Sequence, residues 1–228
     1  MTKAFDAWSA AYNEFAKTGT ELLWPSETLV RLFKGEYVPD LDRDFLGKKV
    51  VDIGFGNGNN LIFLGSLGLS LSGIEVHPEI CQTVTKKLNK LGYVADLREG
   101  ANRSLPFGDE EFDFLVSWNV LHYEDNETAI REAIAEYQRV LKAGGRIFLS
   151  TTGPEHKILK DNRQLGKNRF QIGRKDDFRS GEVYFYFETP ENVYAYLSEQ
   201  FSNVLVGRTH DFLFTETLDW FIATGVKE

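Results

Sequence analysis

The chain has 228 residues, of which 42% are hydrophobic and 26% are charged, and its formal net charge is −8. These values argue against disorder, and the negative charge argues against a protein that coats nucleic acid. No apolar run reaches the roughly 20 residues of a membrane-spanning helix, and the N-terminus lacks the apolar core of a signal peptide, so we expect a cytoplasmic protein without a membrane span. The single cysteine, Cys81, excludes an internal disulfide, and no histidine spacing indicates a metal site.

Strand-like and helix-like segments alternate from about Lys48 onward, which is typical of a parallel sheet covered by helices. Strands are predicted for KKVVDIG (48–54), LSLSGIEV (69–76), YVADL (93–97), FDFLVSW (112–118) and GRIFLST (145–151). The intervening helices are predicted for residues 59–68, 78–92 and 126–145, the last one stopped by Gly144 and Gly145. Two amphipathic segments (5–17 and 26–35) come before this core, and a helix (189–201) and two strand-like runs (203–209 and 218–225) come after it.

The stretch VVDIGFGNGNN (50–60) places glycine at positions 54, 56 and 58, between a predicted strand and a predicted helix. At such a turn the backbone approaches a ligand closely. The dinucleotide fingerprint G-x-G-x-x-G fails here, because its third glycine would fall on Asn59. Asp52 would also face the charge of a pyrophosphate, whereas an acid suits a ligand that carries an ammonium group. An NAD-type loop and a purely structural turn are the alternatives.

Glu75 ends the second predicted strand, where an acid can accept two hydrogen bonds from ribose hydroxyls. Together with Asp52 it describes a ligand with an adenosine-like ribose and an amino-acid tail.

Several segments together carry a family resemblance: DIGFGNG (52–58), Glu75, GANRSLPFGDEEFDFLVSWNVLHY (100–123) and LKAGGRIFLS (141–150). They resemble the class I S-adenosylmethionine-dependent methyltransferases, in particular the small-molecule branch that includes ubiquinone and menaquinone methyltransferases. The resemblance covers residues 48–152. It implies S-adenosyl-L-methionine as cofactor, S-adenosyl-L-homocysteine as product, and a binding site of Asp52, Gly54, Phe55, Gly56, Gly58, Glu75, Val76, Ala101, Asn102, Trp118 and Asn119.

The N-terminal segment FDAWSAAYNEFA resembles the lid helix of that branch, whose aromatic-polar pair, here Tyr12 and Asn13, closes over the methionine end. The alternative for Tyr12 is an ordinary aromatic residue of an amphipathic helix. The chain departs from the family at 100–102, where an acid often binds the adenine amino group. The oxygen of Asn102 or backbone groups would take that role here.

We therefore expect an α/β fold, a doubly wound, mostly parallel seven-stranded Rossmann-like sheet with N-terminal lid helices. A single domain (1–228) would comprise the lid helices (1–47), a cofactor-binding core (48–152), a substrate-side insertion (153–188), and a C-terminal helix and strand pair (189–228).

Methyl transfer from a sulfonium is an in-line displacement that depends mainly on positioning and on exclusion of water, so neither a metal nor a covalent nucleophile is required. A base is needed only where the acceptor must lose a proton. His122 is the candidate base and Tyr123 a candidate orienting residue, because both follow the strand FDFLVSW at the ligand-binding edge. The alternative for each is packing.

Residues 157–175 contain seven Lys or Arg residues and one acid, a local charge of +6. This segment would attract an anionic acceptor, or it is a solvated loop. The aromatic run VYFYF (183–187) would wall an apolar pocket, or it is core.

Two rival functions stay open. One is a nucleic-acid methyltransferase, which the basic segment favours and the proline-free SWNVLHY (117–123) disfavours; the other is a non-catalytic S-adenosylmethionine-binding regulator. The main prediction is methyl transfer to a small-molecule acceptor, anionic or aromatic, and the sequence does not fix the oligomeric state.

Overall fold

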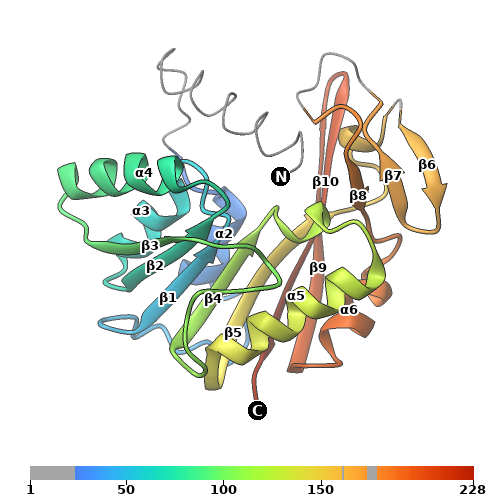
Figure 1. The fold of residues 1–228 in the computed structure, drawn as a ribbon. Coiled ribbons are helices and arrows are strands. Elements are labelled where there is room, and N and C mark those ends of the chain that lie inside the picture. Colours follow the sequence, from blue (N-terminus) through green and yellow to red (C-terminus); the bar gives the residue numbers. More distant parts are fainter. Residues whose placement is uncertain (1–23, 161, 174–178) are drawn as a thin grey trace.

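The structure, a computed structural model, describes residues 24–160, 162–173 and 179–228. Its main element is a seven-stranded sheet in the order β3-β2-β1-β4-β5-β10-β9, in which β10 alone runs antiparallel to its neighbours (Figure 1). This confirms the predicted doubly wound, mostly parallel sheet. The strands are β1 (Lys49–Ile53), β2 (Ser70–Glu75), β3 (Ala95–Glu99), β4 (Phe112–Trp118), β5 (Leu141–Thr152), β9 (Ser202–Leu213) and β10 (Glu216–Val226).

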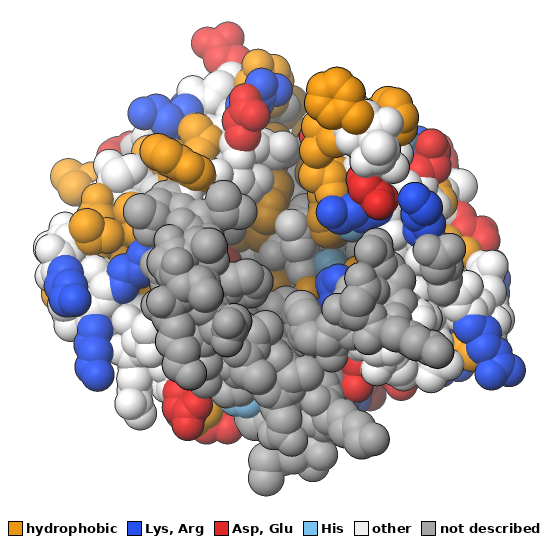
Figure 2. All heavy atoms as spheres, turned by 90° about the horizontal axis from the view of Figure 1, so that it is seen from above, with side chains coloured by type: hydrophobic (Ala, Val, Ile, Leu, Met, Phe, Trp, Pro, Cys, Tyr) orange, Lys and Arg blue, Asp and Glu red, His pale blue; other side chains and the backbone are white. Residues whose placement is uncertain are grey.

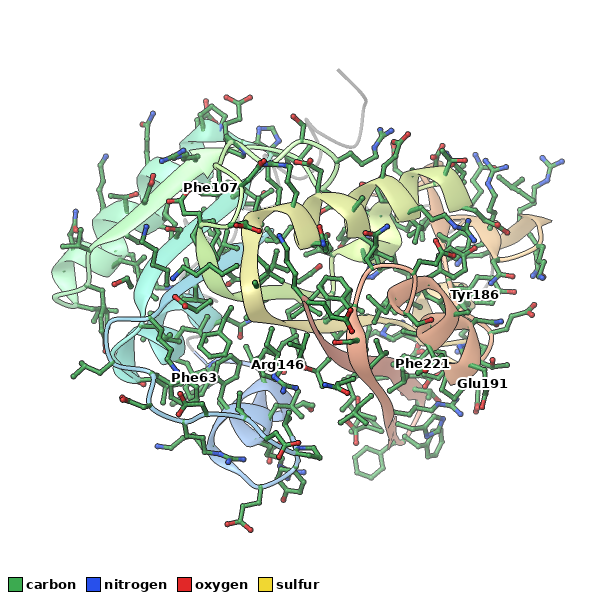
Figure 3. The ribbon with its side chains drawn as sticks, turned by 90° about the horizontal axis from the view of Figure 1, so that it is seen from below. Phe63, Phe107, Arg146, Tyr186, Glu191 and Phe221 are labelled. Atoms are coloured by element: carbon green, nitrogen blue, oxygen red, sulfur yellow. The ribbon has the colours of Figure 1, made fainter. Side chains whose placement is uncertain are left out.

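Helices cover both faces of this sheet, as the alternating pattern predicts. One face carries α2 (Glu27–Lys34), α3 (Asn59–Ser66) and α4 (Pro78–Lys90), and the other carries α5 (Glu127–Val140) and α6 (Pro190–Leu197). Each face has its own apolar core, and Figure 3 shows Phe63 on the side of α2, with Phe107 and Phe221 on the other side. None of the helices in the described ranges is long and apolar enough to cross a bilayer.

The junction of α5 and β5 differs from the prediction. The helix ends at Val140 rather than at the glycine pair, and β5 begins at once with Leu141. The backbone of this stretch has partners outside a helix, because Leu141 lies in register with Phe112 of β4 and the Gly144 N–H donates to the carbonyl oxygen of Lys227 (2.8 Å). Pairing in the sheet therefore overrides the helical pattern.

The second amphipathic segment, expected among the lid helices, packs on the sheet instead. Leu29 and Phe33 of α2 are fully buried, and the Phe33 ring lies 4.5 Å from that of Phe148 in β5. Only the beginning of this segment reaches the ligand-binding edge. The first amphipathic segment, 5–17, with Tyr12 and Asn13, lies outside the described residues.

Parts of the basic segment and of the aromatic run form a second, three-stranded antiparallel sheet. Its strands are β6 (Arg163–Gly166), β7 (Arg169–Gln171) and β8 (Val183–Phe185), and Figure 1 shows it beside the upper ends of β9 and β10. The aromatic run faces two ways: Phe185 and Phe187 join the core under α5 and α6, whereas Tyr184 and Tyr186 pack with Phe170. Two short 3-10 helices, η1 (Leu121–Tyr123) and η2 (Lys157–Leu159), complete the fold.

Candidate functional site

The glycine loop between β1 and α3 has the backbone conformation that its sequence predicts. Gly54, Gly56 and Gly58 have φ values of 63°, 53° and 73°, which side chains with a Cβ rarely adopt. A Cβ on Gly54 would lie 2.7 Å from Val120, and one on Gly58 would lie 2.5 Å from Val84. The loop therefore needs glycine for its conformation and, at these two positions, for space.

Two acids predicted for the site lie next to this loop. Glu75 accepts hydrogen bonds from the Gly56 N–H at Oε1 (3.1 Å) and from the Val76 N–H at Oε2 (2.9 Å). Asp52 is fully buried in β1, and its Oδ2 has no hydrogen-bond partner among the described residues. Burial raises the pKa of both carboxyl groups, and the charge of Glu75 raises that of Asp52 further. Glu75 has backbone donors, whereas an ionised Asp52 would destabilise the fold until a cation or a hydrogen-bond donor reached its Oδ2.

Lys87 of α4 also contacts the loop, and no sequence motif indicates this contact. Its Nζ donates to the carbonyl oxygen of Asn57 (2.8 Å) and to Oδ1 of Asn59 (3.2 Å). These residues are about thirty positions apart in the chain, and only the packing of α4 beside the loop brings them together.

Asn102 lies in a buried polar network that the sequence did not indicate. Its Oδ1 accepts from the hydroxyl of Tyr137 (3.0 Å), and its Nδ2 donates to Glu124 (3.0 Å). The Tyr137 hydroxyl in turn accepts from Ser117 of β4 (3.2 Å). The amide is thus fixed in orientation, and its oxygen keeps one lone pair. Ala101, its neighbour, is exposed, as is Val76 across the β2 end.

A cavity of about 490 Å³ opens at the carboxyl edge of the parallel strands. It extends from the glycine loop, with Gly54, Phe55 and Gly56, past Trp118 and Asn119 to Thr209 and Trp220 of the β9–β10 pair. Asn119 has a left-handed φ of 60°, and its N–H donates to Oγ of Ser150 (2.9 Å). Both residues line the cavity at the end of β4. Figure 2, seen from above, shows a hollow with hydrophobic side chains along it.

His122 and Tyr123 lie in η1, and neither is among the described residues that line this cavity. His122 is only 1% exposed, its ring packs 4.5 Å from Tyr123 and 5.8 Å from Trp220, and its Nδ1 has no hydrogen-bond partner among the described residues. Burial, with nearby His156 and Arg179, lowers the pKa of His122 to about 3. The ring is therefore neutral at pH 7 and a weak base, so this environment favours packing over general-base catalysis.

The comparisons with known proteins agree with this geometry. Residues 51–149 match the family described as methyltransferase domain, a range that runs from β1 into β5. This match covers less than half of the chain. An uncharacterized methyltransferase of Synechocystis is 32% identical over 99 residues, or 43% of this chain and 44% of that protein. A ubiquinone biosynthesis O-methyltransferase of Xanthomonas oryzae is 29% identical over 109 residues, or 47% of this chain and 44% of that protein.

The structural comparison extends the likeness over the whole fold. The 1,6-didemethyltoxoflavin-N1-methyltransferase of Burkholderia thailandensis, solved with its namesake ligand and S-adenosylhomocysteine, has a TM-score of 0.67 at 14% identity, covering 99% of this chain and 87% of that one. At this identity the likeness concerns the fold alone. The aligned part of this chain spans less than half the length of these two curated relatives.

Outside the loop and the cavity, the described residues offer few groups for further chemistry. No cluster of three or more His, Cys, Asp or Glu side chains able to hold a metal occurs within 24–160, 162–173 and 179–228. Cys81 is buried, and its pKa is raised to about 11, chiefly by burial. In the basic segment, Arg169 donates to the carbonyl oxygen of Asp125 (2.6 Å), so this side chain anchors β7. Arg174 and Lys175 lie outside the described residues.

Proposed function

We propose that this chain is an S-adenosyl-L-methionine-dependent methyltransferase that acts on a small molecule. The observation that carries the proposal is the buried acid pair, Asp52 and Glu75, beside the glycine loop, whose residues Gly54 and Gly56 line a cavity that continues toward β9 and β10. The match to the methyltransferase domain family supports it, as does the small-molecule methyltransferase of the same fold.

The residues present fit this cofactor. A ribose would bind at Glu75, whose two oxygens each keep a lone pair beside their backbone donor. The amino-acid tail would lie at the glycine loop, with its ammonium group toward Asp52, whose Oδ2 is orphaned. Gly58, the N-cap of α3, has no side chain to satisfy the first N–H groups of that helix, which suits the tail carboxylate. Exposed Val76 and Ala101 would flank the adenine, with Asn102 held nearby by Tyr137.

When bound, the cofactor supplies an electrophilic methyl group on a sulfonium. The chain's part is to position the acceptor in line with that methyl group and to keep water away. Trp118 and Asn119 at the end of β4 would hold the boundary between cofactor and acceptor. Tyr123 would support the site indirectly, through its ring contact with His122. Neither residue need transfer a proton.

The test is a titration of the purified chain with S-adenosylhomocysteine and with NAD, followed by transfer of labelled methyl groups from S-adenosylmethionine to a small-molecule extract. We expect micromolar binding of S-adenosylhomocysteine, no comparable binding of NAD, and label in a small molecule. Tighter binding of NAD would reject the cofactor assignment. Cofactor binding with no transfer to any extract fraction would favour the regulatory alternative.

The nucleic-acid alternative rests on the basic segment, and salt separates it from the proposal. A nucleic-acid substrate would give binding that falls steeply with salt, with a slope set by the number of phosphates neutralised, whereas a small acceptor would give a shallow dependence. Arg163→Gln with Lys167→Gln tests this, because both side chains are charged residues of the β6–β7 hairpin and neither touches the cavity. We expect S-adenosylhomocysteine affinity to stay unchanged in this variant.

A further inference from the structure

The described side chains of the cavity are aromatic, acidic or neutral polar, together with one isoleucine, Ile222. They include three of the chain's four tryptophans, Trp24, Trp118 and Trp220. The charged residues among them are two acids, Glu27 and Asp211, and none of these described lining residues is a lysine or arginine. Indole faces and carboxylates are the groups with which proteins bind organic cations.

The two ends of the cavity belong to different strands. The cofactor residues sit at the ends of β2, β1 and β4, whereas Trp220 and Asp211 belong to β10 and β9. From β1 to β10 is three strand spacings, about 14 Å. The β9–β10 end therefore lies beyond the cofactor loop, where an acceptor would bind.

Sheet register puts the acid and the indole on the same face. Thr209 pairs with Trp220, and Asp211 pairs with Leu218, so residues 209, 211, 218 and 220 share one face of the antiparallel pair. Asp211 and Trp220 are diagonal neighbours, which lie about 7–8 Å apart in such a ladder. A nitrogen seated on the indole is thus within reach of the carboxylate.

Two buried histidines also pack against Trp220. The indole ring lies 4.2 Å from His156 and 5.8 Å from His122. Burial lowers the pKa of His156 to about 4 and that of His122 to about 3, so both rings are neutral at pH 7. The charges of Lys157 and Arg179 also lower the pKa of His156, and neither residue is among the described cavity lining. Asp219, which acts on the pKa of His156 in the opposite direction, is paired with Arg208 (2.6 Å).

We propose that the acceptor of this proposed methyltransferase is an amine, bound with its nitrogen against the indole of Trp220 and its charge balanced by Asp211. The inference rests on the proposed function and specifies its substrate class. A bound ammonium group first releases one proton to solvent, because only the neutral amine has a lone pair. That lone pair forms the new bond to the methyl carbon while the carbon–sulfur bond breaks and its electron pair stays on sulfur. Positive charge moves from sulfur to nitrogen, and the methylated product leaves as an ammonium ion.

This cavity suits that charge movement. The face of an indole ring stabilises positive charge, and more so where water is excluded, so Trp220 would favour the nitrogen as it becomes cationic. An anionic acceptor would instead meet the carboxylate of Asp211, whereas that of Glu27 is paired with Arg31 (2.6 Å). The described cavity thus weighs against the anionic acceptor that the basic segment indicated. Its tryptophans remain compatible with the aromatic acceptor that the sequence analysis also proposed.

The experiment compares three probes of one shape on the S-adenosylhomocysteine complex: choline, its neutral carbon analogue 3,3-dimethyl-1-butanol, and 3,3-dimethylbutanoate. Dissociation constants are measured by NMR titration. We expect choline to bind about tenfold more tightly than the alcohol and the carboxylate to bind weakest. Equal binding of choline and the alcohol, or preference for the carboxylate, overturns the inference.

Variants assign the preference to the two residues. Trp220→Leu should abolish the preference for choline, and Trp220→Phe should keep most of it. Asp211→Asn should weaken choline binding about three- to tenfold without weakening binding of the alcohol. Glu228→Gln, an exposed acid away from the cavity, is the matched control. S-adenosylhomocysteine affinity reports that each variant is folded. If the wild-type chain does not bind S-adenosylhomocysteine, the proposed function itself fails, and the inference falls with it; a bound cofactor without cation preference overturns the inference alone.

Discussion

The backbone N–H of Gly56 donates to Oε1 of Glu75 at 3.1 Å, which ties the glycine loop to the end of the neighbouring strand. The other carboxylate oxygen accepts from the Val76 N–H at 2.9 Å. Glu75 therefore shapes the loop and, with the lone pairs that remain, can also accept ribose hydroxyls. One side chain supports two parts of the site.

Glu75→Ala should weaken S-adenosylhomocysteine binding about 10- to 100-fold, because charge-assisted hydrogen bonds contribute about 1.5–3 kcal/mol each before compensation. Calorimetric titration measures this. Glu75→Gln, which keeps the size and one oxygen, should lose less. Wild-type affinity in Glu75→Ala would remove the ribose assignment.

Gly58→Ala should destabilise the fold by about 1–3 kcal/mol, since the new Cβ meets Val84 in a left-handed backbone conformation. Gly92→Ala is the matched control: its φ is 83°, and a Cβ there meets nothing within 4 Å. It should show the backbone cost alone. Urea denaturation measures both, and equal losses in the two variants would disprove the steric argument.

Asp52→Asn should change how stability depends on pH. The pKa of Asp52 is raised by burial and by Glu75, so the folded chain binds a proton more tightly than the unfolded chain does. Wild-type stability therefore falls as pH rises above the ordinary carboxyl value of about 4, by at most about 1.4 kcal/mol per pH unit from this group. The variant should lose that part of the fall. Denaturation at pH 4, 5.5 and 7 measures it, and parallel curves for the two proteins would contradict the burial argument.

Asp52→Asn should also bind S-adenosylhomocysteine more weakly, because the amide does not balance the tail ammonium. If Asp52 faces that ammonium, binding to the wild-type chain should release part of a proton, seen as a dependence of the binding enthalpy on the buffer. Unchanged affinity in the variant would separate Asp52 from the ligand.

His122→Gln tests a pH dependence of stability that has the opposite sign to that of Asp52. The pKa of His122 is lowered to about 3 by burial, so the unfolded chain takes up the proton first as pH falls below about 6.5. Wild-type stability should drop between pH 6.5 and 3, by at most about 1.4 kcal/mol per pH unit from this residue, and the variant should drop less. His210→Gln, at an exposed position, is the control. A pH–rate profile with a limb near pH 6.5 that disappears in His122→Gln would instead restore His122 as a base.

The sequence predicted the parts of the fold that local pattern determines. The runs around Val51 and Val116 are short, apolar and bounded by turn residues, and both form central strands. The three positive-φ glycines were readable because few other residues adopt that conformation. By contrast, Leu141 looked helical, and only its partner Phe112 on β4 makes it a strand residue.

The far end of the site was not predictable from local pattern. Trp220 reads as a strand residue near the end of the sequence, and Asp211 reads as a polar residue before a turn. Their common face at the cavity depends on the register of β9 with β10 and on the insertion of β10 beside β5, neither of which leaves a motif. Lys87 is similar, because its contact with Asn57 depends on how α4 packs.

The position of β10 also has a consequence for the order in which the sheet can assemble. β9 leaves the ribosome before β10, yet it contacts the sheet only through β10, which lies between β9 and β5. Until residues 216–226 are made, the open edge of β5 and both edges of β9 present unpaired backbone groups. During synthesis this chain therefore passes through a stage in which its longest strands have no partners on these edges, and that stage is the one at which a holding chaperone would matter most.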